Sequence, residues 1–165
     1  MRRRLMLIVA VAAMAIVPAQ GAAARGGGWQ PLPAPPFDAA ICGTTFHLSF
    51  PVNKEYFRAA QEPDGTILLK VTGSFKVSIR ADTGKSVSLL NVSGPGRSLI
   101  FPNNDFDFIS QGRNILLLTP DQSKATGLPE AFITTGSVDY LFRADGTAKV
   151  NRQGHIAENL CSVLG

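Results

Sequence analysis

The sequence predicts an all-β protein: an antiparallel β-barrel, or a sandwich, of about eight strands closed by one disulfide. Apolar and polar residues alternate over long stretches, and turn sequences punctuate those stretches. No segment after residue 24 has a convincing helical period, apart from a turn at 157–164. Repeated strands and turns without helices are typical of antiparallel barrels and sandwiches.

The alternation is clearest between Ile67 and Ile79, where every odd position is apolar or glycine and the even positions are mostly polar. A period of two is typical of a strand with one buried face. Turn sequences at 63–66, 82–85 and 144–147 contain Asp and Gly, which tolerate positive φ. A change of parity at Leu89 and Leu90 predicts a β-bulge. We expect strands at 44–50, 54–61, 66–80, 86–93, 97–101, 105–118, 131–143 and 147–156.

Residues 72–82 and 135–145 share one pattern: Thr-Gly-Ser, three alternating apolar residues, and then Arg-Ala-Asp before a turn. The pattern indicates either a duplication or two hairpins that solve the same local problem. Its glycines, Gly73 and Gly136, fall in the middle of an apolar strand face. Glycine weakens a strand interior, so we expect inward bends there that let long strands coil around a closed barrel.

The N-terminus has the three parts of a secretory signal peptide over residues 1–24. Three arginines precede an apolar run of 13 residues from Leu5 to Val17, which is shorter than the roughly 20 that a membrane-spanning helix needs. Small residues allow cleavage after Gly21 or Ala24. We expect a secreted protein without stable membrane insertion after processing, a Gly/Pro-rich linker at 25–37 and a folded domain at 38–165.

Both cysteines lie in the expected folded domain, Cys42 at its start and Cys161 near its end. In an oxidising compartment, an even number of cysteines without C-x-x-C spacing favours a structural bridge. A reactive thiol is the alternative, but no histidine or cation cluster adjoins either cysteine in sequence. The sequence therefore predicts one Cys42–Cys161 disulfide.

Charge and residue types exclude several function classes. Removal of Arg2, Arg3 and Arg4 leaves 13 of the 16 basic residues against 12 acidic ones, a net charge of +1, so we expect no nucleic-acid partner. Two histidines and two cysteines are too few for a zinc site, and the acidic stretch at 103–107 lacks the calcium-loop pattern. Without a G-x-S-x-G elbow we expect no serine triad, and we expect neither a metal nor a cofactor.

Several short motifs carry a resemblance to known proteins. Cys42-Gly43 and a near-terminal Leu160-Cys161 bracket the similarity, with further motifs at 50–56, 91–95 and 112–116. Together with the alanine-rich signal, these motifs make the chain similar to small secreted actinobacterial proteins of unassigned function. In outline, a glycine-bent secreted barrel also resembles lipocalin-like and allene-oxide-cyclase-like barrels, which implies a ligand cavity.

The expected inward face mixes small residues and hydroxyls with aromatic and aliphatic side chains, which leaves room for a modest cavity. From this face we predict non-catalytic binding of a small, partly apolar ligand or a cell-envelope component. One alternative is a cyclase or hydrolase that uses a carboxylate such as Glu55 or Glu130, and another is a structural or interaction protein. The predicted ligand-binding residues are Gly73, Phe75, Val77, Thr134, Gly136, Val138 and Tyr140.

Overall fold

The computed structural model describes Val9, Ala10 and residues 28–165. The signal peptide expected at residues 1–24, with its two cleavage sites, lies outside the described residues except for Val9 and Ala10. Where the structure is described, no helix is long and apolar enough to cross a membrane.

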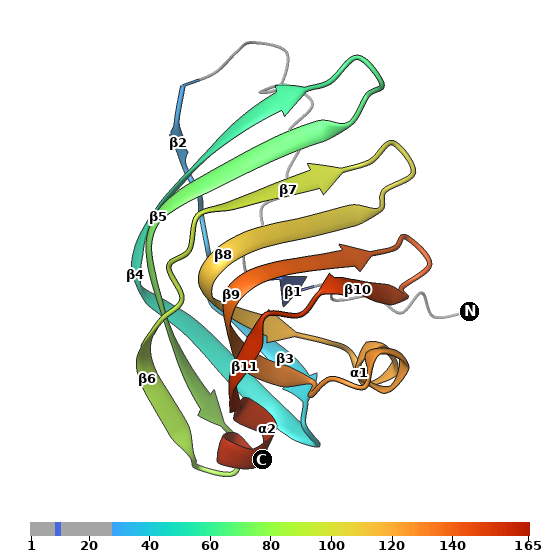
Figure 1. Cartoon of the computed structure of the whole chain (residues 1–165). Coiled ribbons are helices and arrows are strands. Elements are labelled where there is room, and N and C mark those ends of the chain that lie inside the picture. Colours follow the sequence, from blue (N-terminus) through green and yellow to red (C-terminus); the bar gives the residue numbers. More distant parts are fainter. Residues whose placement is uncertain (1–8, 11–27) are drawn as a thin grey trace, which may run out of the picture.

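The described strands form one 11-stranded antiparallel sheet, whose main path runs β10-β9-β8-β7-β5-β4-β2 (Figure 1). Four further strands pair beside this path: β1 on β8, β3 on β4, β6 on β5 and β11 on β9. The strands are β1 Val9–Ala10, β2 Gln30–Pro31, β3 Phe37–Ile41, β4 Thr44–Gln61, β5 Ile67–Ala81, β6 Ser86–Asn91, β7 Gly96–Ile100, β8 Phe106–Leu117, β9 Ala131–Phe142, β10 Ala148–Arg152 and β11 His155–Asn159.

Four long strands, β4, β5, β8 and β9, bend in the middle and change neighbours at the bend. The first half of β5 pairs with β7 and its second half with β6. The first half of β9 pairs with β11 and its second half with β10. The sheet therefore has an upper half that is continuous from β2 to β10 and a lower half that is split into two layers (Figure 1).

Glycines lie at these bends, and two of them, Gly73 and Gly136, were expected to bend inward but are exposed. Gly73 has a φ of 135° and lies opposite Glu55 on β4. Gly112 and Gly136 pair with each other across β8 and β9 with φ values of 97° and 90°. Residues other than glycine rarely adopt such φ values, because glycine alone has no Cβ atom. The bends therefore require glycine at these positions.

The closed barrel of about eight strands is a correction. In the described part of the chain no ladder joins β10 to β2 or β4, so the sheet stays open. The physical reason lies in the bends, which fold the sheet back on its own faces and bury apolar surface without bringing its edges together. Residues 44–61 form one strand instead of two, and the segment predicted as one strand at 147–156 divides into β10 and β11.

Two separate cores result from this folding. The first core lies between the two lower layers and contains Phe46, Leu48, Phe75, Val77, Ile79, Ile115, Ile133, Leu160 and Leu164. The second core lies on the other side of β8 and β9 and contains Phe106, Phe108, Leu116, Leu118, Leu128, Phe132, Val138, Tyr140 and Phe142. Side chains thus fill the space that the sequence assigned to a barrel interior.

Two short helices complete the fold, α1 Pro120–Thr126 and α2 Leu160–Leu164. A capping box formed by Thr119 and Gln122 starts α1, and the buried Gln122 side chain donates to the Gly146 carbonyl at 3.0 Å. The turn expected at 157–164 contains α2. The sequence prediction missed α1, which is too short to show a helical period.

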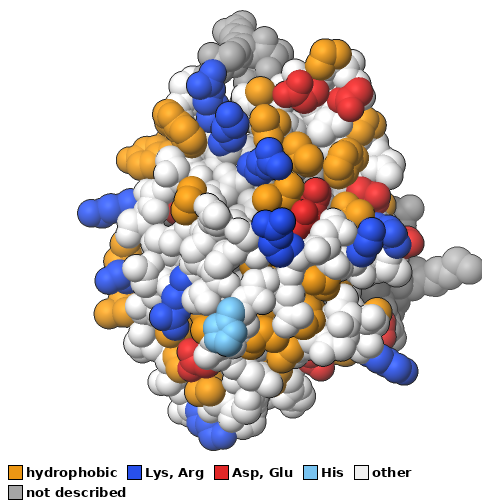
Figure 2. All heavy atoms as spheres, viewed as in Figure 1, with side chains coloured by type: hydrophobic (Ala, Val, Ile, Leu, Met, Phe, Trp, Pro, Cys, Tyr) orange, Lys and Arg blue, Asp and Glu red, His pale blue; other side chains and the backbone are white. Residues whose placement is uncertain are grey.

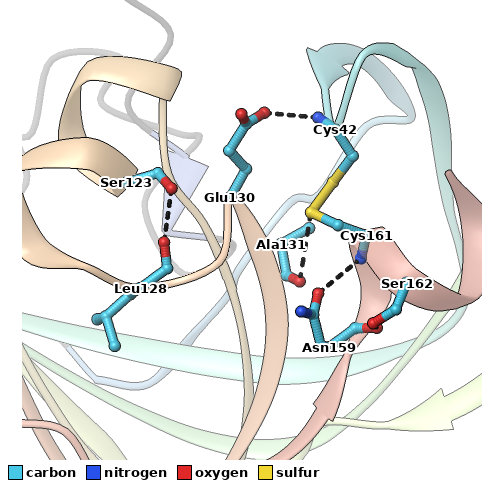
Figure 3. The surroundings of a disulfide bond; sticks show 8 residues. All are labelled: Cys42, Ser123, Leu128, Glu130, Ala131, Asn159, Cys161 and Ser162. Atoms are coloured by element: carbon cyan, nitrogen blue, oxygen red, sulfur yellow. Dashed lines mark hydrogen bonds between the residues drawn. A yellow bond between two sulfur atoms is a disulfide. The ribbon is translucent and has the colours of Figure 1, made fainter.

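The predicted disulfide is confirmed: Cys42 in the β3–β4 turn is bonded to Cys161 in α2, with 5.1 Å between their Cα atoms (Figure 3). Beside it, the carboxylate of Glu130 accepts a hydrogen bond from the Cys42 amide. The bond joins the turn at the start of the domain to the C-terminal helix, across 119 residues of sequence.

Candidate functional site

Four of the seven residues predicted to bind a ligand lie in the two cores, whereas Gly73 and Gly136 are exposed at the bends. Phe75 and Val77 belong to the first core, and Val138 and Tyr140 belong to the second. Thr134 is fully buried, and its hydroxyl lies 3.1 Å from the carbonyl oxygens of Gln153 and His155. The structure therefore brings these residues together in two groups that share no common cavity, and ligand binding by them stays a prediction.

The two predicted glycines differ in their surroundings. A Cβ atom at Gly73 would lie 2.1 Å from the carbonyl oxygen of Lys54 and 2.7 Å from the Cα of Glu55, so the backbones of β4 and β5 approach closely there. A Cβ atom at Gly136 would meet nothing within 4 Å. Gly73 therefore permits a close contact between strands, whereas Gly136 provides only its backbone conformation.

A small cavity of about 30 Å³ lies near the bends of β4, β5 and β8. Its polar wall consists of Glu55, Ser98, Ser110 and Asn114, all of them at least nine-tenths buried. This volume suits one or two water molecules and is far smaller than an ordinary ligand pocket.

The two carboxylates considered for catalysis have different environments. Burial raises the pKa of Glu55 to about 7, and no other residue that lines its cavity is ionisable. Glu130 serves the turn at the disulfide, where it binds the Cys42 amide (Figure 3). Among the described residues, neither carboxylate forms an ion pair within 4 Å.

A groove of about 690 Å³ lies on the outer face of the upper half-sheet, and we call it the sheet groove. Its charged lining residues are Lys70, Arg97, Asp139 and Arg152. Its apolar lining includes Ile109 and Trp29, the only tryptophan in the chain, whose surface is 50% exposed. The groove therefore combines charge with apolar surface and is open to solvent.

Strand register explains why three cations lie in one row at and beside the sheet groove. Arg58 on β4 lies opposite Lys70 on β5, and Lys70 lies opposite Arg97 on β7. We call these three residues the cation row; all three are exposed. Directly opposed side chains on antiparallel strands have Cβ atoms about 5 Å apart, and like charges in this position are destabilising. Figure 2 shows Lys and Arg side chains following one another across the upper half of this face, with hydrophobic side chains beside them.

The described residues supply no ion pair within 4 Å for any member of the cation row. The next row of the outer face places the partly exposed Leu68 and Leu99 beside these cations. The row continues through Asp107 to Leu141. The outer face thus offers a positively charged strip next to an aliphatic one.

Two acidic residues lie beyond the cation row. The carboxylate of Asp139 accepts a hydrogen bond from Asn151 at 2.9 Å. Asp107 has one buried carboxylate oxygen with no hydrogen-bond partner. Burial, and then the negative charge of Asp139, raise the pKa of Asp107 to about 6, although Arg97 acts in the opposite direction. These groups end the positive strip on the β9 side.

A third polar cluster lies on the lower half of the sheet. Nδ1 of His47 is 2.8 Å from a carboxylate oxygen of Asp38, and its Nε2 is 2.8 Å from one of Asp82. Hydrogen bonds to Asp82 and then Asp38 raise the pKa of His47. Both ring nitrogens are hydrogen-bonded to carboxylates, so this histidine connects β4 with β3 and with the β5–β6 turn. No group of three or more His, Cys, Asp or Glu side chains suited to a metal ion occurs within the described ranges.

The sequence prediction missed the sheet groove. Arg58, Lys70 and Arg97 each lie on the polar side of a strand, where a charge is ordinary. Only the pairing of β4, β5 and β7 brings them into one row. The available signal was weak: three cations at the outward positions of strands that could become neighbours.

The comparisons give no relative on which to base a function: no family model, curated protein or solved structure matches the chain.

Proposed function

We propose that this protein binds, without catalysis, a small anionic molecule with an apolar part, or an anionic component of the cell envelope, in the sheet groove. The observation that carries the proposal is the cation row, in which three directly opposed cations have no ion-pair partner among the described residues. A bound anion would offset the repulsion that this register imposes on the free protein.

The apolar part of the ligand is supported by the surfaces beside the row. Trp29 lines the groove with half of its surface exposed, and the leucine row runs parallel to the cations. Ligand sites commonly combine apolar surface with a few placed polar groups. A cell-envelope component would suit the secretion expected from the signal peptide and the disulfide.

An enzyme is less well supported. Glu55 lines a cavity large enough only for water, and Glu130 accepts a hydrogen bond from the Cys42 amide at the disulfide. The groove contains Asp139, and its neighbour Asp107 has a raised pKa, but Asp107 does not line the groove and the carboxylate of Asp139 accepts a hydrogen bond from Asn151. Binding therefore accounts for more of the geometry than catalysis does.

The test uses Trp29 as a reporter, since it is the only tryptophan and lines the groove. We expect dodecyl phosphate, below its micelle concentration, to change the fluorescence of Trp29 saturably, while the uncharged dodecyl maltoside does so only weakly. The double variant Lys70→Gln/Arg97→Gln should bind dodecyl phosphate roughly 25-fold more weakly, at about 1 kcal/mol for each lost cation.

The matched control is Lys124→Gln/Arg143→Gln, which removes the same charge at exposed positions outside the groove. It should bind as the unaltered protein does. Equal binding of the charged and uncharged amphiphiles, or equal weakening in both double variants, would overturn the proposal.

A further inference from the structure

The small cavity beside Glu55 is lined by polar side chains that lack hydrogen-bond partners among the described residues. Glu55 is 8% exposed and Ser98 is 3% exposed, yet neither side chain hydrogen-bonds to another described residue. The Ser110 hydroxyl donates to the side-chain oxygen of Asn114 at 2.8 Å. The side-chain nitrogen of Asn114 makes one long contact, 3.5 Å from the Gly112 carbonyl oxygen. Buried polar groups in proteins nearly always have a partner, and ordered water is the usual one when protein is absent.

Volume and chemistry agree on the occupant. One water needs about 10–15 Å³ of such space, so the cavity of about 30 Å³ has room for about two. A buried water makes two to four hydrogen bonds, and the wall supplies a carboxyl group, a hydroxyl group and an amide nitrogen for them. Phe75 and Phe108 form apolar parts of the wall.

We propose that this small cavity is a built water site, in which about two water molecules join Glu55, held as a neutral acid, to Ser98 and Asn114. The neutral carboxyl supplies one donor and further acceptors to the water, whereas an ionised one would only accept. The site is separate from the sheet groove, although Val71, Gly96 and Ser110 line both.

The surroundings of Glu55 favour the protonated form. The ten other lining residues, contributed by β5, β7, β8 and the β6–β7 connection, carry no charge. Opposite Glu55 on β5 stands Gly73, and the nearby cations Lys54 and Lys70 occupy the opposite face of the sheet. Burial without a compensating cation raises the pKa of this carboxyl to about 7.

The consequence for stability has a definite sign. In the unfolded chain Glu55 ionises near its ordinary pKa of 4.5, but in the folded protein it keeps its proton to about pH 7. Between these values the folded state binds more protons, so the stability contributed by this group falls as the pH rises from about 4.5 to 7.

The experiment compares the full protein with Glu55→Gln, which keeps the shape and the neutral charge, and with Glu62→Gln as an exposed control. We expect the unaltered protein to lose roughly 5 °C of melting temperature relative to Glu55→Gln between pH 4.5 and 7, and Glu62→Gln to follow the unaltered protein. A difference that does not change with pH would overturn the neutral acid.

Two measurements that leave Glu55 in place keep the test decisive if Glu55→Gln does not fold. Infrared spectra of Asp107→Asn, which lacks the other carboxyl group with a raised pKa, should contain at pH 6 the band of a protonated carboxyl group that disappears near pH 8. Water-to-protein nuclear Overhauser effects should connect long-lived water with the Asn114 side-chain amide. Absence of the infrared band would contradict the neutral acid, and absence of the water contact would contradict the water site.

Discussion

At the residue scale, side chains outside the cores connect parts of the chain that are distant in sequence. His47 on β4 links Asp38 on the edge strand β3 to Asp82 in the β5–β6 turn. His47 lies between the buried Phe46 and Leu48, so alternation along β4 turns it outward, and its side chain is 31% exposed. Its two partners could not be predicted, because they depend on the pairing of three strands.

The His47 link predicts a pH dependence. Its folded-state pKa lies above the ordinary 6.5, so the stabilising contribution is fully present below pH 6.5 and is lost as the pH rises through the folded-state value. Titration followed by NMR should give a pKa above 6.5 in the unaltered protein and lower values in Asp82→Asn and Asp38→Asn. An unchanged histidine titration in both variants would contradict the link.

The two bend glycines provide a matched pair of substitutions. Gly73 and Gly136 both have positive φ, but only Gly73 lacks space for a Cβ atom. We expect Gly136→Ala to lower the free energy of unfolding by about 1–2 kcal/mol through backbone strain. Gly73→Ala should cost more than about 3 kcal/mol, because it adds overlap with the Lys54 carbonyl. Urea denaturation measures both, and equal losses would mean that the close approach of β4 and β5 does not matter.

At the element scale, local patterns predicted strands well and their boundaries less well. Alternation placed β5 at 66–80 against the observed Ile67–Ala81, and the parity change at Leu89 and Leu90 is a bulge in which Leu89 has a φ of 55°. Two strands were expected at 44–50 and 54–61, but a register shift between Ser49 and Val52 carries β4 past Pro51 as one strand. The sequence Thr119-Pro-Asp-Gln122 carries the capping-box signature that would have revealed α1.

The disulfide joins the β3–β4 turn to the C-terminal helix α2. In the chain-entropy model, closure of a loop of about 100 residues stabilises by about 4–5 kcal/mol, and this loop spans 119 residues. We expect Cys42→Ser/Cys161→Ser to melt well below the unaltered protein, and a reducing agent to have no further effect on it. A melting temperature that is the same with and without the bond would contradict a structural role.

At the scale of the whole molecule, the bends decide where a ligand can bind. A closed barrel would leave its interior for a guest, and this expectation directed the sequence prediction to the inward face. The open sheet instead folds onto itself, fills two cores with side chains and leaves the outer face of its upper half hollowed. The pairing of strands that are distant in sequence determines both the filled cores and the groove on the outer face. That pairing cannot be predicted from the local patterns of a single sequence.

The central claim is that the anionic ligand binds the outer face and not the interior, and amide chemical-shift mapping with dodecyl phosphate tests it most directly. In the 15N-labelled protein, we predict that the largest shifts fall on the strands of the cation row and the groove, at Arg58, Lys70, Arg97 and Ile109. They should shrink in Lys70→Gln/Arg97→Gln. Shifts that instead concentrate on core positions such as Val77 and Tyr140, or that persist unchanged in the variant, would contradict the account.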